Sequence, residues 1–165
     1  MNTIFSKVIS LVISLWIAKV FLFSLPYKFT NHPDTQHIFT TIGQWMSATI
    51  QLDLGLFFSS YGAYIVGTVE LVTSILLLIA SLFLALNLLK VSQNEMISKK
   101  LYFVGGLLSA AVMSGAVFFH LFTPLGIKVI HEGKSDNGSL FFAAVSIIVL
   151  GLILAFINKS VMKSN

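Results

Sequence analysis

Four long apolar stretches dominate this chain of 165 residues, and they cover about residues 5–27, 61–88, 101–122 and 139–157. Each is long enough to cross the roughly 30 Å hydrocarbon core of a bilayer, which takes about 20 helical residues. A lone strand would leave its backbone N–H and C=O groups unpaired in lipid, so each stretch is predicted to be a helix. The sequence therefore predicts an all-α integral membrane four-helix bundle, with residues 1–165 forming one domain.

The composition agrees with this prediction and excludes several classes of function. Hydrophobic residues make up 56% of the chain and charged residues only 10%, whereas soluble domains carry about 25% charged residues. Cysteine is absent, which excludes disulfides, thiolate metal sites, haem attachment and thiol redox chemistry. The net charge is +4, but the lysines do not form a stripe between aromatic residues. We therefore expect no nucleic-acid partner.

The distribution of lysines predicts the orientation in the membrane. The N-terminus, the loop after residue 88 and the C-terminus fall on one side, and the two remaining loops fall on the other. The first side carries Lys7, Lys90, Lys99, Lys100, Lys159 and Lys163. The positive-inside rule places both termini in the cytoplasm. We expect residues 5–27 to remain as a span rather than to be cleaved as a signal peptide, because Lys19 interrupts the apolar run and no A-x-A site follows.

The outer loop, residues 29–60, is too long to be a plain connection. Asp34, after Pro33, is a candidate helix cap. Apolar residues then recur at helical spacing, and they are Ile38, Phe39, Ile42, Trp45, Met46 and Ile50. This pattern predicts an amphipathic helix on the outer face. Two interpretations stay open for it, a surface anchor and a lid over a cavity between the helices.

Three ionisable residues, Lys19, Glu70 and His120, fall inside the apolar stretches. A charge at the bilayer centre costs roughly 2.5–3.5 kcal/mol on insertion scales, so such residues normally face protein or water. Lys19 lies about 10 Å and Glu70 about 12 Å from the outer ends of their segments, at 1.5 Å per residue. We infer a Lys19–Glu70 ion pair.

Small residues accompany Glu70 on one face of its predicted helix, and they are Ala63, Gly67, Ser74 and Ser81. A stripe of small residues also marks the segment 101–122 as a packing centre.

Two interpretations of the ion pair stay open, as does the charge state of Glu70. The pair could only hold two helices in register. Alternatively Lys19, Glu70, His120 and Tyr64 line a polar pocket that binds a ligand or relays a proton, with Lys28 and Trp45 as secondary contacts. His120 and Lys28 also fit plain interfacial positions, and Tyr64 and Trp45 also fit an aromatic belt. We expect no metal site, no catalytic residue and no self-sufficient enzyme, since no nucleophile–base pair, metal-ligand spacing or phosphate loop is present.

Several short pieces of the chain, taken in order, resemble the DoxX-like family of small membrane proteins. The first piece is Lys19, Phe21-Leu22-Phe23 and Lys28. The second is Gly67-Thr68-Val69-Glu70-Leu71. The third runs from Ala116 through His120 to Thr123-Pro124-Leu125-Gly126, and the fourth is Asp136-Asn137-Gly138-Ser139-Leu140-Phe141. The resemblance covers nearly the whole chain. One departure is the run Ser24-Leu25-Pro26, which stands where the family commonly has a small residue.

The resemblance implies a four-helix protein of the bacterial cytoplasmic membrane. Some members are subunits of quinone-linked oxidoreductase assemblies, so it implies an accessory subunit with a membrane redox partner, no intrinsic cofactor and a quinone- or lipid-like ligand. The alternative is a non-catalytic chaperone or scaffold whose buried charges are structural, and a homo-oligomer fits either function. A small proton-coupled transporter is disfavoured, because the two halves show no inverted repeat.

Overall fold

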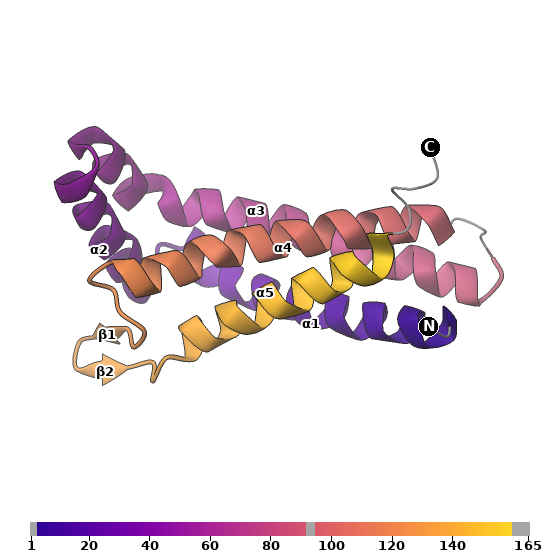
Figure 1. Cartoon of the computed structure of the whole chain (residues 1–165). Helices are drawn as coiled ribbons and strands as arrows, with labels where there is room; N and C mark the ends of the chain where they lie inside the picture. Colours follow the sequence, from indigo (N-terminus) through magenta and orange to yellow (C-terminus); the bar gives the residue numbers. More distant parts are fainter. Residues whose placement is uncertain (1–2, 92–94, 160–165) are drawn as a thin grey trace.

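Four helices, each long and apolar enough to cross a membrane, lie alongside one another in a computed structural model that describes residues 3–91 and 95–159 (Figure 1). They are α1 (Thr3–Phe29), α3 (Leu52–Leu88), α4 (Glu95–Phe122) and α5 (Ser139–Asn158). Their length and composition indicate a multi-pass protein of a lipid bilayer. The predicted all-α membrane bundle is confirmed.

The two ends of the bundle differ in structure and charge. One end carries α2 (Pro33–Thr49), the first part of α3 and a hairpin of β1 (Ile130–His131) and β2 (Lys134–Ser135), and we name it the cap end (Figure 1). At the opposite end α1 begins, α3 is followed by α4, and α5 finishes. We name this the lysine-rich end, for Lys7, Lys90, Lys99, Lys100 and Lys159. Lys163 lies outside the described residues.

Two helices begin earlier than the sequence predicts. The expected helix 61–88 starts at Leu52, and the expected helix 101–122 starts at Glu95. The predicted outer loop 29–60 therefore holds α2 and the first nine residues of α3. With 37 residues, α3 is about 55 Å long, far more than the roughly 30 Å of hydrocarbon that a span must cross. Its first part belongs to the cap rather than to the four-helix contact.

Helix α2 confirms the predicted amphipathic helix. Its first-turn geometry corrects one detail, because His32 rather than Asp34 is the capping residue, and the Asp34 N–H donates to His32 Nδ1 over 3.4 Å. The buried face of α2 packs against the start of α3 and the chain after α4. This apolar cluster consists of Ile42, Met46, Leu125 and Val129, with Ile38, Trp45, Phe58 and Phe119 against it. Ile50 is 60% exposed and lies past the end of the helix.

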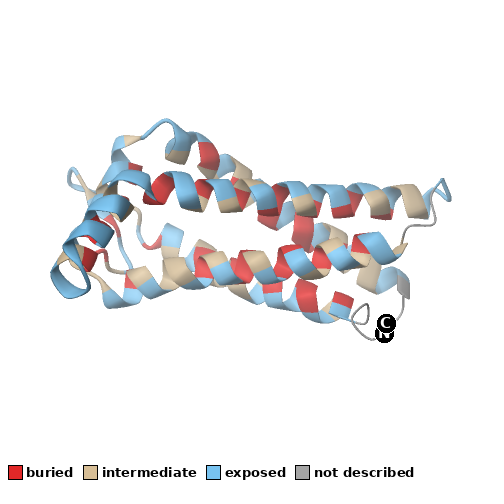
Figure 2. Cartoon of the chain, turned by 90° about the horizontal axis from the view of Figure 1, so that it is seen from above, coloured by how far each residue is buried: buried red, intermediate tan, exposed pale blue. Residues whose placement is uncertain are grey.

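Small residues set the closest helix contacts. A Cβ on Gly106 would lie 2.6 Å from the Gly151 carbonyl oxygen, and one on Gly151 would lie 2.7 Å from the Gly106 carbonyl oxygen, so α4 and α5 touch backbone to backbone there. Gly43 of α2 and Gly55 of α3 make a second contact of this kind. Buried residues follow the inward faces of the long helices (Figure 2). The predicted packing stripe of α4 is thus confirmed around Gly106, whereas Gly115 has open space beside it.

We expect Gly106→Ala to lower the free energy of unfolding by about 1–3 kcal/mol, because the added methyl group has no room and the two helices must move apart. Gly115→Ala is the matched control, since a Cβ there meets nothing within 4 Å. Chemical unfolding in detergent, followed by circular dichroism, measures both. Equal effects of the two substitutions would contradict the contact between α4 and α5.

Candidate functional site

Glu70 is the central residue of α3 and is 2% exposed. Its partners come from the last turns of α1. Lys28 Nζ lies 2.8 Å from Glu70 Oε2, and the Ser24 hydroxyl donates to the same oxygen over 2.7 Å. Lys28 Nζ also lies 2.8 Å from Ser24 Oγ, so the three side chains form a closed triangle. Lys28 and Ser24 are four residues apart on a helix, which points both toward α3.

Two local features of the sequence allow this triangle. Gly67, one turn before Glu70, leaves space for α1, since a Cβ there would lie 3.3 Å from Lys28 Cβ and 3.2 Å from the Phe29 ring. Helix α1 continues through Pro26 to Phe29, so the run Ser24-Leu25-Pro26 does not break it. Ser24 instead becomes a partner of Glu70. This run therefore contributes a hydroxyl group to the buried cluster.

The inferred Lys19–Glu70 ion pair is wrong. Lys19 is exposed, and its Nζ lies 5.5 Å from the Trp16 ring centroid and 5.9 Å from that of Phe23. Nine residues separate Lys19 from Lys28, which at about 100° per residue turns the side chain to the opposite face of α1. The depth estimate failed because α3 begins at Leu52, which places Glu70 level with the end of α1. The stripe of small residues on the face of Glu70 is buried as expected.

His120 has a different environment from Glu70. It is 7% exposed at the end of α4, its Nδ1 lies 2.6 Å from the Gly126 carbonyl oxygen, and its ring stands edge-on to Phe141 at 5.8 Å. A carbonyl only accepts, so Nδ1 carries the hydrogen in this bond. His120 therefore ties the chain after α4 back onto its helix. None of its contacts within the described residues includes Glu70 or Lys28.

The two aromatic candidates also separate. Tyr64, 39% exposed, stacks on Phe29 with ring centroids 6.4 Å apart, which places it beside the Lys28 end of the cluster. Trp45 packs edge-on to Phe118 at 6.3 Å in the cap. The structure thus brings together Lys28, Glu70 and, next to them, Tyr64. It leaves Lys19, His120 and Trp45 elsewhere.

Sequence reasoning missed a polar contact between α2 and the hairpin. His131 Nδ1 lies 2.7 Å from Asp34 Oδ1, and the His37 ring stacks on His131 at 4.7 Å. The hydrogen bond with His131 holds the pKa of Asp34 below its usual value, although desolvation acts in the opposite direction. Asp34 and His131 lie 97 residues apart in the sequence. The only local feature that indicates a hairpin here is the turn at Glu132 and Gly133, whose φ angles are 50° and 75°.

Asp136, the first residue of the fourth piece of the family resemblance, organises the start of α5. Its Oδ1 accepts from the N–H groups of Val129 (2.8 Å) and Gly138 (2.9 Å), and its Oδ2 accepts from the Leu140 N–H (3.1 Å). Burial acts to raise the pKa of Asp136, but these three backbone hydrogen bonds outweigh it and hold the pKa below the usual value. The carboxylate therefore joins the hairpin loop to the first turn of α5.

Two cavities lie away from the Glu70 cluster. One, of about 170 Å³, lies at the lysine-rich end between α1, α3, α4 and α5. The other is a shallow polar groove of about 360 Å³ along α2, lined in part by His37 and His131. The apolar space beneath α2 is filled by side chains. Within residues 3–91 and 95–159, no three His, Asp or Glu side chains are placed to hold a metal ion.

No protein-family model matches the chain, and no curated protein or solved structure matches it either.

We expect Lys28→Met or Glu70→Leu alone to lower the free energy of unfolding by about 3–5 kcal/mol, since each leaves the other charge buried without its partner. The double variant should recover most of this loss, because it removes both charges together. Lys19→Met is the control and should change stability by about 0.5 kcal/mol or less, as an exposed residue does. Unfolding in detergent measures all four. A Lys19→Met effect as large as that of Lys28→Met would contradict the assigned pair.

We expect Asp136→Ala to lower the free energy of unfolding by about 1–2 kcal/mol at neutral pH, as for loss of a helix cap. The lowered pKa of Asp136 means that its contribution is complete above the unfolded pKa of about 3.9 and is lost as pH falls through the folded value. Stability measured between pH 7 and pH 3 should therefore fall less steeply below about pH 4 in this variant. Asp53→Ala, an exposed acid in the first turn of α3, is the control. An unchanged acid slope in Asp136→Ala would contradict this role.

Proposed function

We propose that this chain is a non-catalytic accessory subunit or scaffold of a membrane assembly, in which the buried charges hold the helices in register. The observation that carries this proposal is the closed triangle of Glu70, Lys28 and Ser24. A carboxylate that already binds an ammonium group and a hydroxyl group on the neighbouring helix serves packing first. The cavity at the lysine-rich end and the groove along α2 are both lined by other residues.

The resemblance to the DoxX-like family supports the same class of function and names its setting. It supports a location in the bacterial cytoplasmic membrane, in which the lysine-rich end would face the cytoplasm with both termini. The first partner to seek is then a membrane redox protein. The second candidate partner is another copy of this chain.

The cap end offers the surface that a partner would use. The first part of α3 extends past the end of α1 and presents exposed apolar side chains, among them Leu54 at 41%, Phe57 at 50% and Tyr61 at 55% exposure. The length of α3 carries these residues toward or beyond the headgroups, where lipid tails do not cover them. An apolar helix face in that position favours contact with another protein.

A ligand site at Glu70 is the second candidate, and one observation favours it. Both hydrogen bonds of the carboxylate go to Oε2, and Oε1 accepts none from the described residues. Among the described residues, every fully enclosed side-chain oxygen has a hydrogen-bond partner. Because Oε1 has no such partner, it is not fully enclosed. A hydroxyl group of a quinol or lipid could donate to it, beside Tyr64 and Phe29.

Native mass spectrometry of the full chain in mild detergent separates the two functions. For a scaffold, we expect a copurifying polypeptide with both wild type and Glu70→Gln. That polypeptide should be lost when the exposed surface is changed by Leu54→Ser with Phe57→Ser. Val72→Ser with Leu82→Ser, exposed on α3 away from the cap, is the control. A copurified quinone or lipid that disappears in Glu70→Gln would overturn the scaffold proposal in favour of the ligand site.

A further inference from the structure

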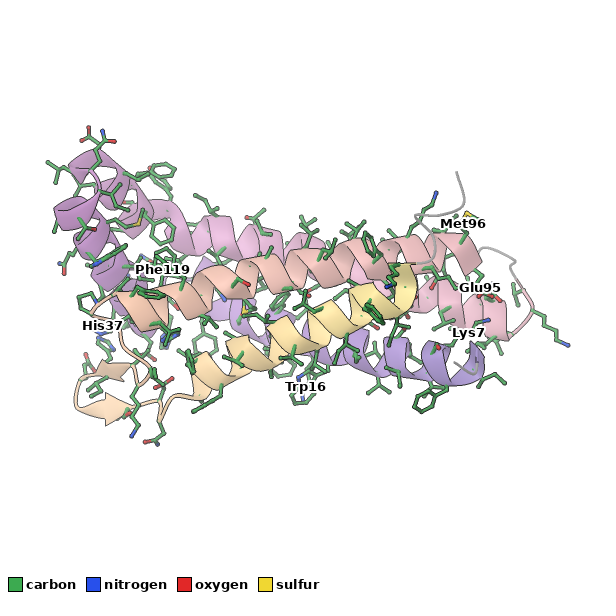
Figure 3. The ribbon with its side chains drawn as sticks, in the orientation of Figure 1. Lys7, Trp16, His37, Glu95, Met96 and Phe119 are labelled. Atoms are coloured by element: carbon green, nitrogen blue, oxygen red, sulfur yellow. The ribbon has the colours of Figure 1, made fainter. Side chains whose placement is uncertain are left out.

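The cavity at the lysine-rich end has charged and polar side chains in its lining that the proposed function does not use. It has a volume of about 170 Å³ between α1, α3, α4 and α5, room for several water molecules at roughly 30 Å³ each. Figure 3 shows Lys7 and Glu95 at this end of the bundle, far from His37 and Phe119 at the cap. The cavity is lined by Ser6, Lys7, Ser10, Leu84, Glu95, Ser98, Lys99, Tyr102, Ile157 and Asn158.

The charges around this cavity sum to a net positive value. Lys7 Nζ lies 2.8 Å from Glu95 Oε2, and Lys99 Nζ lies 2.7 Å from Glu95 Oε1. Two ammonium groups therefore share one carboxylate. Each ammonium group has three N–H donors, and the contact with Glu95 engages one of them. The lysines keep both a surplus charge and donors for another acceptor.

Buried polar side chains form the floor of the cavity. Ser10 is 2% exposed and Asn158 is 5% exposed. Asn158 Nδ2 donates to Ser10 Oγ over 3.0 Å and to the Leu154 carbonyl oxygen over 2.9 Å, which fixes the amide. Ser10 accepts in that bond, so its own hydroxyl hydrogen is left to donate. Tyr102, 1% exposed, bonds to Ser81 deeper in the bundle.

The charged and polar groups in the lining of this cavity call for a polar occupant, and the surplus positive charge selects an anion. The exposed lysines at the same end, Lys90, Lys100 and Lys159, add to the local positive potential. Basic pockets between transmembrane helices are where anionic lipid headgroups bind. We propose that this cavity binds a phosphate group, carried by an anionic phospholipid of the adjacent leaflet or free in solution. Lys7, Lys99 and the Ser10 hydroxyl are the donors.

The test uses the full chain in mild detergent and three probes, namely phosphatidylglycerol, phosphatidylcholine and inorganic phosphate. Native mass spectrometry measures how much of each is retained. We expect Lys7→Gln with Lys99→Gln to reduce phosphatidylglycerol binding about tenfold or more, because both lysines act on the phosphate. Lys90→Gln with Lys100→Gln removes the same charge from the same end without touching the cavity, and it should leave most of the binding intact.

Glu95→Gln should change phosphate binding in the direction opposite to the lysine substitutions. A purely structural role of these charges would not produce that result. It removes the carboxylate that competes with the phosphate, so binding should become several-fold tighter. This variant keeps the proposal falsifiable if the double lysine variant fails to fold, which thermal unfolding would detect.

Retention of phosphatidylglycerol over phosphatidylcholine, lost only in the cavity variant, supports the site with a lipid as its source. Inorganic phosphate that binds in place of the lipid, with the same dependence on Lys7 and Lys99, supports the site with a soluble source. Equal losses in the two double variants would overturn the proposal in favour of diffuse surface charge. Absence of binding by the wild type, or weaker binding by Glu95→Gln, would overturn it as well.

Discussion

Glu70 sits in the middle of the longest helix with 2% of its surface exposed, and a carboxylate at that position needs its charge met by another part of the protein. The group that meets it is Lys28, the second-last residue of α1. This contact places the end of α1 level with the middle of α3. Eighteen residues of α3, 52–69, precede Glu70, so about 27 Å of that helix extends beyond the pair toward the cap.

The cap exists because the projecting part of α3 needs packing partners. Helix α2 folds back against it through the contact of Gly43 with Gly55. The chain after α4 adds Leu125 and Val129 to the same apolar cluster. His120 and Asp136 then fix that chain at its two ends, by bonds to the Gly126 carbonyl and to three backbone N–H groups. Polar groups at the cap thus organise loops.

The two charged clusters of the bundle differ in net charge. At Glu70 one lysine meets one carboxylate, and the charges cancel inside the protein. At the lysine-rich end two lysines meet the one carboxylate of Glu95, and a cavity with a polar floor lies beside them. Balanced charge favours a structural role for the first cluster. The surplus charge and the space favour a ligand at the second.

The sequence by itself determined the four spans, their helical form, the amphipathic helix within residues 29–60 and the burial of Glu70. These follow from local properties, namely apolar length, periodicity and the cost of burying a short charged side chain in lipid. The start of α3 was not determined in this way, because residues 52–60 mix polar and apolar residues and become helical against α2. Tertiary structure alone decided that Lys28 rather than Lys19 meets Glu70, and that Lys7 meets Glu95. Such pairs depend on helix rotation and relative height, which only packing between helices sets, across 42 and 88 residues of sequence.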